Sequence, residues 1–293
     1  MFAFCADPAA LPQWQWFACY LTSGTHQAFY WSIGVVLLLI ALAAPAALAF
    51  GFAGALALRT HLAPLRWLGL GYTSMVRGVP DIVFFLFVPI AVDQGIEYLL
   101  HHVACPDWTE PIRQGNEFRV CPEAKVPQTG AARWVHDIYG FLLALLAFAL
   151  VFGAFAANTL HGAMRAVPRA QMETAEAYGM TPRQAFRRVM LPQMWVYALP
   201  GLSNLWMILV KATPLLFLLG IRDIVFWARE LGGAKTTVYT YPHPDWRLWY
   251  FLAVLVFYLL LTWASERGFA ALMTRLARGQ ATAAGEALRR AGT

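Results

Sequence analysis

Residues 27–58 form an unbroken stretch that contains no Asp, Glu, Lys or Arg. A helix needs about 20 predominantly apolar residues to cross the hydrocarbon core of a bilayer, so this stretch is long enough to span it. Pro45 lies near its middle, where a membrane helix tolerates proline. The whole chain agrees, because 59% of its residues are hydrophobic, 13% are charged and its mean hydropathy is +0.53. We therefore expect an all-α integral membrane protein.

Four further apolar runs follow, at about residues 67–92, 138–161, 194–220 and 248–265. The runs at 67–92 and 194–220 are interrupted by charged residues. Together with the first stretch they predict five transmembrane helices. The segment before residues 27–58 carries no Lys or Arg. We therefore expect residues 27–58 to be a membrane span and not a cleaved signal peptide.

The distribution of basic residues predicts the orientation, because Lys and Arg are retained on the cytoplasmic side. Segments 59–66 and 165–188 and the tail after the fifth span are rich in arginine, whereas segment 93–137 is net acidic. We expect a multi-pass protein of a bacterial inner membrane, with its N-terminus in the periplasm and its C-terminus in the cytoplasm. The resulting parts are a periplasmic segment 1–27, a transmembrane domain 28–275 with a periplasmic loop 93–137, and a cytoplasmic tail 276–293. The formal net charge of +6 comes from basic residues clustered between the apolar runs, which the membrane topology explains. It does not indicate binding of nucleic acid.

Cysteines occur only in the segments expected outside the cytoplasm. Cys105 and Cys121 lie in the acidic loop, in a compartment where disulfides persist, and we expect them to pair. A closed loop of that size contributes roughly 3 kcal/mol in the chain-entropy model. Two free thiols are the alternative. Cys5 and Cys19 could pair or be incidental.

The segment between the third and fourth spans has a distinctive pattern. Residues 172–182 read METAEAYGMTP, which predicts a short helix, a stop at Gly179 and a new helix start at Thr181-Pro182. We expect the second helix to run from about residue 183 to 189 and to end at Leu191-Pro192, where the chain turns into the fourth span. Such a helix-turn-helix suits docking of a soluble partner, and an ordinary solvated loop is the alternative.

The spacing within this segment resembles a known motif. Glu173 and Ala175 are followed by Gly179 six residues after the glutamate and by Leu191-Pro192, as in the EAA loop of ABC importer permeases. The chain departs from that motif with Thr174 and Val189. The resemblance implies a type I ABC importer permease fold whose loop 165–192 is a cytoplasmic pair of coupling helices that inserts into a separate ATPase subunit. The residues carried over for coupling are Glu173, Ala175, Gly179, Leu191 and Pro192.

The likeness extends over about residues 28–275 and indicates the polar amino acid branch. Residues 77–81 read RGVPD, which resembles the Arg-Gly-x-Pro signature of that branch, and residues 197–213 resemble it too. The chain is similar to Q-type subunits of histidine/lysine/arginine/ornithine and opine permeases. This implies transport of polar, cationic amino acids. It also implies three kinds of partner: a homologous permease subunit in a mixed pair, two ATPase subunits that carry ATP and Mg, and a periplasmic amino-acid-binding protein.

Charged residues inside the expected spans are candidates for the translocation path. Arg77 and Asp81 are expected near mid-bilayer, where a charge costs at least about 2.5 kcal/mol and needs a partner or water. They either pair with each other, four residues apart, or Asp81 gives the cavity a negative field beside backbone broken at Gly78 and Pro80. Lys211 is either part of an ion pair with another span or a group near the substrate carboxylate. The full set of path candidates is Arg77, Asp81, Asn204, Lys211 and Thr213.

Other chemistry lacks support in the sequence. Residues 232–236 superficially resemble a phosphate loop but have Ala234 where the glycine before the lysine is required, so we expect no nucleotide site and no cofactor in this chain. We expect no metal site and no catalytic residue, and we expect His101 and His102 to lie on a polar surface. The competing classes are a secondary amino acid transporter, which needs inverted repeats, and a membrane assembly subunit without transport activity. Two insertions, the long loop 93–137 and residues 239–246, are expected to face outside.

Overall fold

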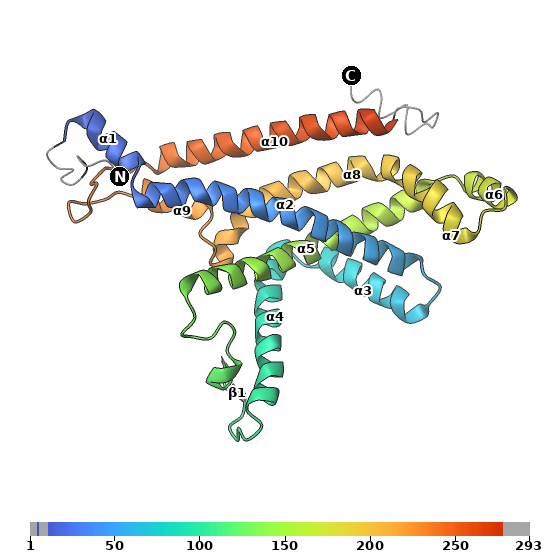
Figure 1. Cartoon of the computed structure of the whole chain (residues 1–293), viewed down its shortest axis with the longest axis horizontal. Helices are drawn as coiled ribbons and strands as arrows, with labels where there is room; N and C mark the ends of the chain where they lie inside the picture. Colours follow the sequence, from blue (N-terminus) through green and yellow to red (C-terminus); the bar gives the residue numbers. More distant parts are fainter. Residues whose placement is uncertain (1–4, 6–10, 278–293) are drawn as a thin grey trace. The chain divides into compact units, whose positions relative to one another are not determined.

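The computed structural model describes residue 5 and residues 11–277 of the chain, and its described part is mostly helical (Figure 1). Of the expected tail 276–293, residues 278–293 lie outside this description, as do residues 1–4 and 6–10 of the N-terminal segment. Five described helices are long and apolar enough to cross a membrane, as expected: Gly24–Arg59, Asp81–Ala104, Arg133–Ala166, Pro182–Leu219 and Arg247–Leu276.

The described part of the chain contains long helices, short helices and one pair of short strands. The longer helices are α2 (Gly24–Arg59), α3 (Ala63–Gly78), α4 (Asp81–Ala104), α5 (Arg133–Ala166), α8 (Leu191–Ala212) and α10 (Arg247–Ala277). The shorter helices are α1 (Gln13–Leu21), η3 (Pro122–Ala124), α6 (Arg169–Ala177), α7 (Pro182–Ala185), η4 (Phe186–Met190), η5 (Thr213–Leu219) and α9 (Ile224–Gly232). The described strands are β1 (Arg113–Gln114) and β2 (Glu117–Phe118), which pair antiparallel.

The chain divides into two compact units. Unit 1 comprises Met1–Ala41, Leu199–Phe217 and Arg222–Thr293, and unit 2 comprises Leu42–Ala198 and Leu218–Ile221. The predicted second span at 67–92 is wrong, because the helix breaks between Gly78 and Asp81 in unit 2. Pro80 disfavours helical backbone at Val79, which is extended with φ −122° and ψ 143°. The span is α4, which begins only after this break.

A seam of small residues holds α2 against α5 in unit 2. A Cβ added at Gly51 would lie 2.6 Å from Cβ of Ala156, and one added at Gly54 would lie 2.8 Å from Cβ of Ala157. Small residues at these positions let two helix backbones approach closely, which is how membrane helices gain packing contacts without a hydrophobic driving force. Next to this seam, the rings of Phe85 in α4 and Phe148 in α5 stack with centroids 4.5 Å apart.

Replacing Gly51 with alanine is expected to destabilise the protein by about 1–3 kcal/mol, the usual effect of overpacking a tight contact. The measurement is thermal unfolding of the detergent-solubilised protein. Gly34 lies in the same helix with nothing within 4 Å of an added Cβ, so Gly34→Ala is the matched control. That control should be neutral or slightly stabilising, because alanine is the better helix former. Equal stability of the two variants would contradict the seam.

The loop between α4 and α5 is shorter and more ordered than expected. Helix α4 continues to Ala104, so residues 93–104 of the predicted loop 93–137 are helical, and α5 begins at Arg133. The predicted start of the loop was wrong because acidic residues are usually exposed. Glu97 is only 4% exposed, and its carboxylate lies 2.9 Å from Nζ of Lys125. A buried carboxylate with this cation fixes the loop to α4.

A disulfide between Cys105 and Cys121 closes the same loop in the structure. The expectation of a polar surface at both histidines is wrong for His101, which is buried and whose Nδ1 accepts a hydrogen bond from the backbone N–H of Cys121 at 3.1 Å. Satisfying a backbone donor next to the disulfide explains its burial. His102 is exposed. The His101 ring lies close to both sulfur atoms, but cysteines in a disulfide have no thiolate to bind a metal.

Helix α9 in unit 1 begins at a buried cap. The Asp223 carboxylate accepts a hydrogen bond from the backbone N–H of Phe226 at 2.9 Å, the usual role of an N-cap aspartate. Burial raises the pKa of Asp223 to about 6, although this hydrogen bond works in the opposite direction. At the other end of α9, a Cβ added at Gly232 would lie 2.7 Å from Cα of Arg247. Glycine therefore allows the start of α10 to pack directly on the end of α9.

Candidate coupling and translocation site

The turn between α6 and α7 is built around Gly179. Its φ of 77° lies in the left-handed region, where glycine avoids the steric cost of a Cβ. The backbone N–H of Met180 donates to the carbonyl of Ala175 at 3.0 Å, and that of Gly179 donates to the carbonyl of Glu176 at 2.9 Å. These two bonds define a Schellman motif, which satisfies the last carbonyls of α6 and reverses the chain.

Thr181 starts the second helix of the pair through a reciprocal capping box. Its Oγ1 accepts a hydrogen bond from the backbone N–H of Gln184 at 3.4 Å, and Oε1 of Gln184 accepts one from the backbone N–H of Thr181 at 2.9 Å. Pro182 follows at the first helical position, where its missing N–H has no intrahelical partner in any case. The stop at Gly179 and the restart at Thr181-Pro182 therefore agree with the expectation from the sequence.

The coupling candidates differ in accessibility. Ala175 is buried at 4% exposure, whereas Glu173 and Gly179 are exposed. Ala175 is the buried residue of α6, a helix that packs against α7 and η4. Glu173 is left available for a charge-assisted hydrogen bond with a group outside this chain.

The predicted turn at Leu191-Pro192 is wrong. The chain passes from α7 through the π-helical turn η4 into α8 without leaving the helix. Leu191 donates its backbone N–H to the carbonyl of Phe186, five residues earlier. Pro192 cannot donate a helical bond and its ring conflicts with the preceding turn, and the wider π turn directly before it relieves that conflict. Pro192 thus lies in the first turn of α8.

Arg59, at the end of α2, contacts this segment in a way that sequence reasoning missed. Its guanidinium carbon lies 5.4 Å from the centroid of the Phe186 ring, within cation–π range, and the guanidinium also contacts the sulfur of Met190. Within unit 2, this contact joins the end of α2 to η4. The sequence marks Arg59 only as one of several basic residues, and no pattern names its partner.

The helix break between α3 and α4 places Arg77 and Asp81 differently from the expectation. Arg77 lies in the last turn of α3 and Asp81 in the first turn of α4, so neither lies in the middle of a span. Each charge is on the favourable end of its helix dipole. No ion pair joins them among the salt bridges of the described residues, which argues against the alternative that they serve each other as partners.

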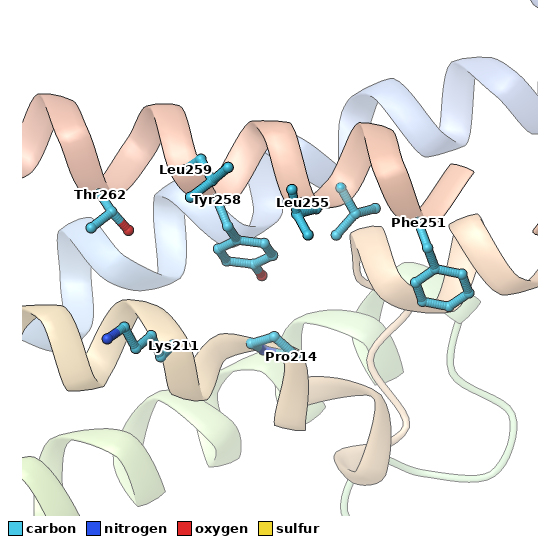
Figure 2. Close-up of a pocket in the computed structure, with 8 residues that line it drawn as sticks. Lys211, Pro214, Phe251, Leu255, Tyr258, Leu259 and Thr262 are labelled. Carbon is cyan, nitrogen blue, oxygen red and sulfur yellow. The ribbon is translucent and has the colours of Figure 1, made fainter. Parts of the chain in front are cut away.

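A groove of about 490 Å³ lies in unit 1 beside Lys211, the charged residue among those that line it (Figure 2). Figure 2 shows Lys211 and Pro214 on one wall, while α10 supplies the opposite wall. The residues of that wall are Phe251, Val254, Leu255, Tyr258, Leu259 and Thr262. Since Lys211 is exposed and lies within a membrane span, its ammonium needs water, a substrate or a partner chain.

Thr213 contacts Tyr258, a residue that lines the groove. It is fully buried, its Oγ1 donates to the carbonyl of Val210 at 2.9 Å and lies 2.8 Å from the Tyr258 hydroxyl. The structure thus brings Lys211, Thr213 and Tyr258 together. Asn204 is exposed and does not line the groove, although it lies seven residues before Lys211 and therefore on the same face of α8. Tyr258 was missed, because an aromatic residue in an apolar run carries no signal of its own.

Five membrane helices, a helix-turn-helix between the third and fourth of them and an apolar groove with one cation define a polytopic membrane permease. The chain belongs to the family of binding-protein-dependent transport system inner membrane components, which matches residues 47–278. It is therefore a multi-pass inner membrane permease of the ABC type and not itself an enzyme.

Relatives from several bacteria are permease subunits of transport systems for amino acids and octopine. The histidine/lysine/arginine/ornithine transport system permease protein HisQ of Escherichia coli strain K12 is 34% identical over 197 residues, which cover 67% of this chain and 70% of HisQ. The arginine ABC transporter permease protein ArtQ of Haemophilus influenzae is 36% identical over 207 residues, 71% of this chain and 75% of ArtQ. The octopine transport system permease protein OccQ of Agrobacterium tumefaciens is 29% identical over 233 residues, 79% of this chain and 83% of OccQ.

A solved structure shares the fold. The crystal structure of an amino acid ABC transporter with histidines matches with a TM-score of 0.59 at 19% sequence identity, covering 85% of this chain and 94% of that chain. At this sequence identity, the similarity supports the fold alone. Together with the family and the relatives, it supports an ABC permease for amino acids with the expected helical fold.

Proposed function

We propose that this chain is the permease subunit of an ATP-driven importer for cationic amino acids of the histidine, lysine, arginine and ornithine kind. The observation that carries the coupling part is the turn at Gly179, because its left-handed backbone leaves Glu173 exposed beside a tightly reversed helix pair. The substrate class rests on the relatives, whose names refer to histidine, lysine, arginine, ornithine and octopine transport.

Coupling in this proposal runs through the segment 165–192. The pair α6 and α7 docks into a groove of a separate ATPase subunit, where Glu173 meets an arginine or a backbone N–H of that partner. Ala175 and Gly179 keep the two helices close enough to move as one body. Leu191 and Pro192 continue that body into α8, and the contact between Arg59 and Phe186 links it to α2.

The partners and orientation follow from the same proposal. The N-terminus and the disulfide-closed loop face the periplasm, and the arginine-rich segments and the C-terminus face the cytoplasm. The complex contains two ATPase subunits that hold ATP and Mg, a second permease subunit that differs from this chain, and a periplasmic amino-acid-binding protein. Membrane lipid surrounds the spans, and no nucleic acid is involved.

The path residues divide by charge. Lys211, exposed in its apolar groove, suits the α-carboxylate of an amino acid, with Thr213 and Tyr258 fixing the wall behind it. Asp81 stands at the start of α4 beside broken backbone, where its carboxylate contributes a negative field favouring a cationic side chain. Arg77 and Asn204 complete the polar positions of the path.

Replacing Asp81 with asparagine is expected to lower arginine uptake roughly fivefold, the effect of about 1 kcal/mol of lost attraction between charges. ATP hydrolysis should fall much less, because Asp81 lies outside the coupling segment. The measurement is uptake and hydrolysis in the same proteoliposomes. Uptake of neutral glutamine serves as the internal control. Equal losses of arginine uptake, glutamine uptake and hydrolysis would contradict a role for Asp81 in the path.

The proposed function is tested by uptake of radiolabelled arginine, lysine, histidine and glutamine into proteoliposomes. These contain this chain with its partner permease, ATPase and binding protein. The proposal predicts uptake of the cationic substrates above that of glutamine, with ATP and the binding protein both required. Preference for glutamine would refute the substrate class. Uptake driven by an ion gradient without ATP would revive the secondary transporter.

A further inference from the structure

Helix α1 is a short helix that is not one of the five membrane helices. It ends at Leu21, directly before α2 begins at Gly24, and contains no charged residue. Its two faces differ sharply, because Cys19 and Tyr20 are buried while a second face is open. Neither the family nor the proposed transport path gives this helix a role.

Unit 1 holds α1 firmly in place. A disulfide joins Cys19 to Cys5, and the Tyr20 hydroxyl contacts Nε2 of His243 at 3.2 Å and the Tyr250 hydroxyl at 3.0 Å. Nδ1 of His243 lies 2.7 Å from the carbonyl of Pro244 and is therefore the protonated nitrogen, which leaves Nε2 to accept from Tyr20. Burial raises the pKa of Tyr20, so its hydroxyl keeps this proton. The insertion before α10 thus serves to clamp α1.

Aromatic contacts complete the clamp. The Trp16 ring packs edge-on against Tyr241, and the Phe17 ring stacks on Trp246 with centroids 5.9 Å apart. Trp246 in turn stacks on the His243 ring at 4.3 Å. These contacts therefore fix the orientation of α1 within unit 1.

The open face is an apolar stripe at helical spacing. Trp14, Phe17 and Leu21 lie at positions i, i+3 and i+7, and they are 69%, 39% and 46% exposed. Exposed tryptophans also stand near the beginnings of the two adjoining membrane helices, Trp31 at 78% in α2 and Trp249 at 66% in α10. Trp and Tyr gather where a membrane protein meets the lipid headgroups.

We propose that α1 is an interfacial anchor that lies in the headgroup region of the bilayer and inserts Trp14, Phe17 and Leu21 among the lipids. The lipid interface is favoured over a protein partner for two reasons. Helix α1 is tied within a few residues to a span, which keeps it at the membrane surface. Exposed tryptophans also lie near the starts of α2 and α10, and tryptophan is the residue type that gathers at the level of the lipid headgroups. An interfacial helix buries such a stripe by about 5–10 Å.

The anchor is tested by photocrosslinking in the assembled transporter. The photoreactive residue p-benzoylphenylalanine replaces Trp14 or Phe17 in the full chain. The complex is reconstituted with its partner permease and ATPase in phosphatidylethanolamine–phosphatidylglycerol vesicles that carry tritiated acyl chains, with the binding protein added outside. The same substitution at Trp249 is the control for an exposed aromatic position within a membrane helix. Val238, 91% exposed in the turn just before the insertion, is the control for a position away from the stripe.

The anchor predicts tritiated lipid adducts at Trp14 and Phe17 at a yield comparable to Trp249 and at least about tenfold above Val238. An adduct with the binding protein or the second permease subunit at Trp14 and Phe17 would overturn the proposal. It would also be overturned if neither position yields a lipid adduct while Trp249 does. Size-exclusion chromatography verifies that each variant assembles. Trp14 is not one of the clamp residues named above, so its variant tests the anchor separately from Phe17, which also stacks on Trp246.

Discussion

Replacing Gly179 with valine should lower ATP-driven amino acid uptake at least about tenfold, since a left-handed backbone costs an L-residue about 1–2 kcal/mol and more when it is β-branched. At φ 77° the valine would strain the turn, and the Schellman bonds from Gly179 and Met180 would be lost with it. The pair α6 and α7 would then no longer present Glu173 in the geometry that docking needs.

Asparagine at the same position is the matched control. It tolerates the left-handed region far better than other residues, so Gly179→Asn should keep most of the uptake. Uptake into proteoliposomes and retention of the ATPase subunit during affinity purification are measured for both variants. Equal activity of Gly179→Val and wild type would mean that this turn does not transmit the work of ATP hydrolysis.

Replacing Lys211 with methionine is the second change with a large expected effect. The variant keeps most of the side-chain length but removes the ammonium, and a hydrogen bond to a charged group contributes about 1.5–3 kcal/mol, so KM for arginine uptake should rise at least about tenfold. Assembly of the complex and its basal ATP hydrolysis should remain, because Lys211 makes no ion pair with other described residues.

Lys211→Arg separates charge from shape, and Leu255→Met is a control in the opposite wall of the same groove. The arginine variant should retain much of the affinity, and the Leu255 variant should behave like wild type. If Lys211→Met instead prevents the complex from assembling, Lys211 pairs with a carboxylate of another chain and is structural. A normal KM in an assembled complex would remove Lys211 from the path.

The sequence predicted the five spans because each is a long apolar run, and apolar length is the strongest constraint that a bilayer imposes. It failed at the second span, where the apolar run continues across Val79 and Pro80 and hydropathy does not register a break in the backbone. It also failed at residues 93–104, because Asp93 and Glu97 give this part of α4 the acidic composition of a loop. The partner that buries Glu97 lies 28 residues away in sequence.

The candidate site was predictable where local rules apply. Gly179 and the start at Thr181-Pro182 follow from capping preferences that act over a few residues. The turn expected at Leu191-Pro192 was wrong, because a π turn can accept a proline that would otherwise end the helix. The groove beside Lys211 was not predictable, because Tyr258 belongs to another helix and only tertiary packing brings it to Thr213.

The most direct test of an ATP-coupled permease measures ATP hydrolysis and arginine uptake together in the same proteoliposomes while the arginine-loaded binding protein is titrated. The vesicles hold the complete complex, with wild-type chain or Gly179→Val. We expect both rates to rise together with wild type, and Gly179→Val to abolish the rise in uptake. Uptake that proceeds without ATP and is unchanged by Gly179→Val would contradict it.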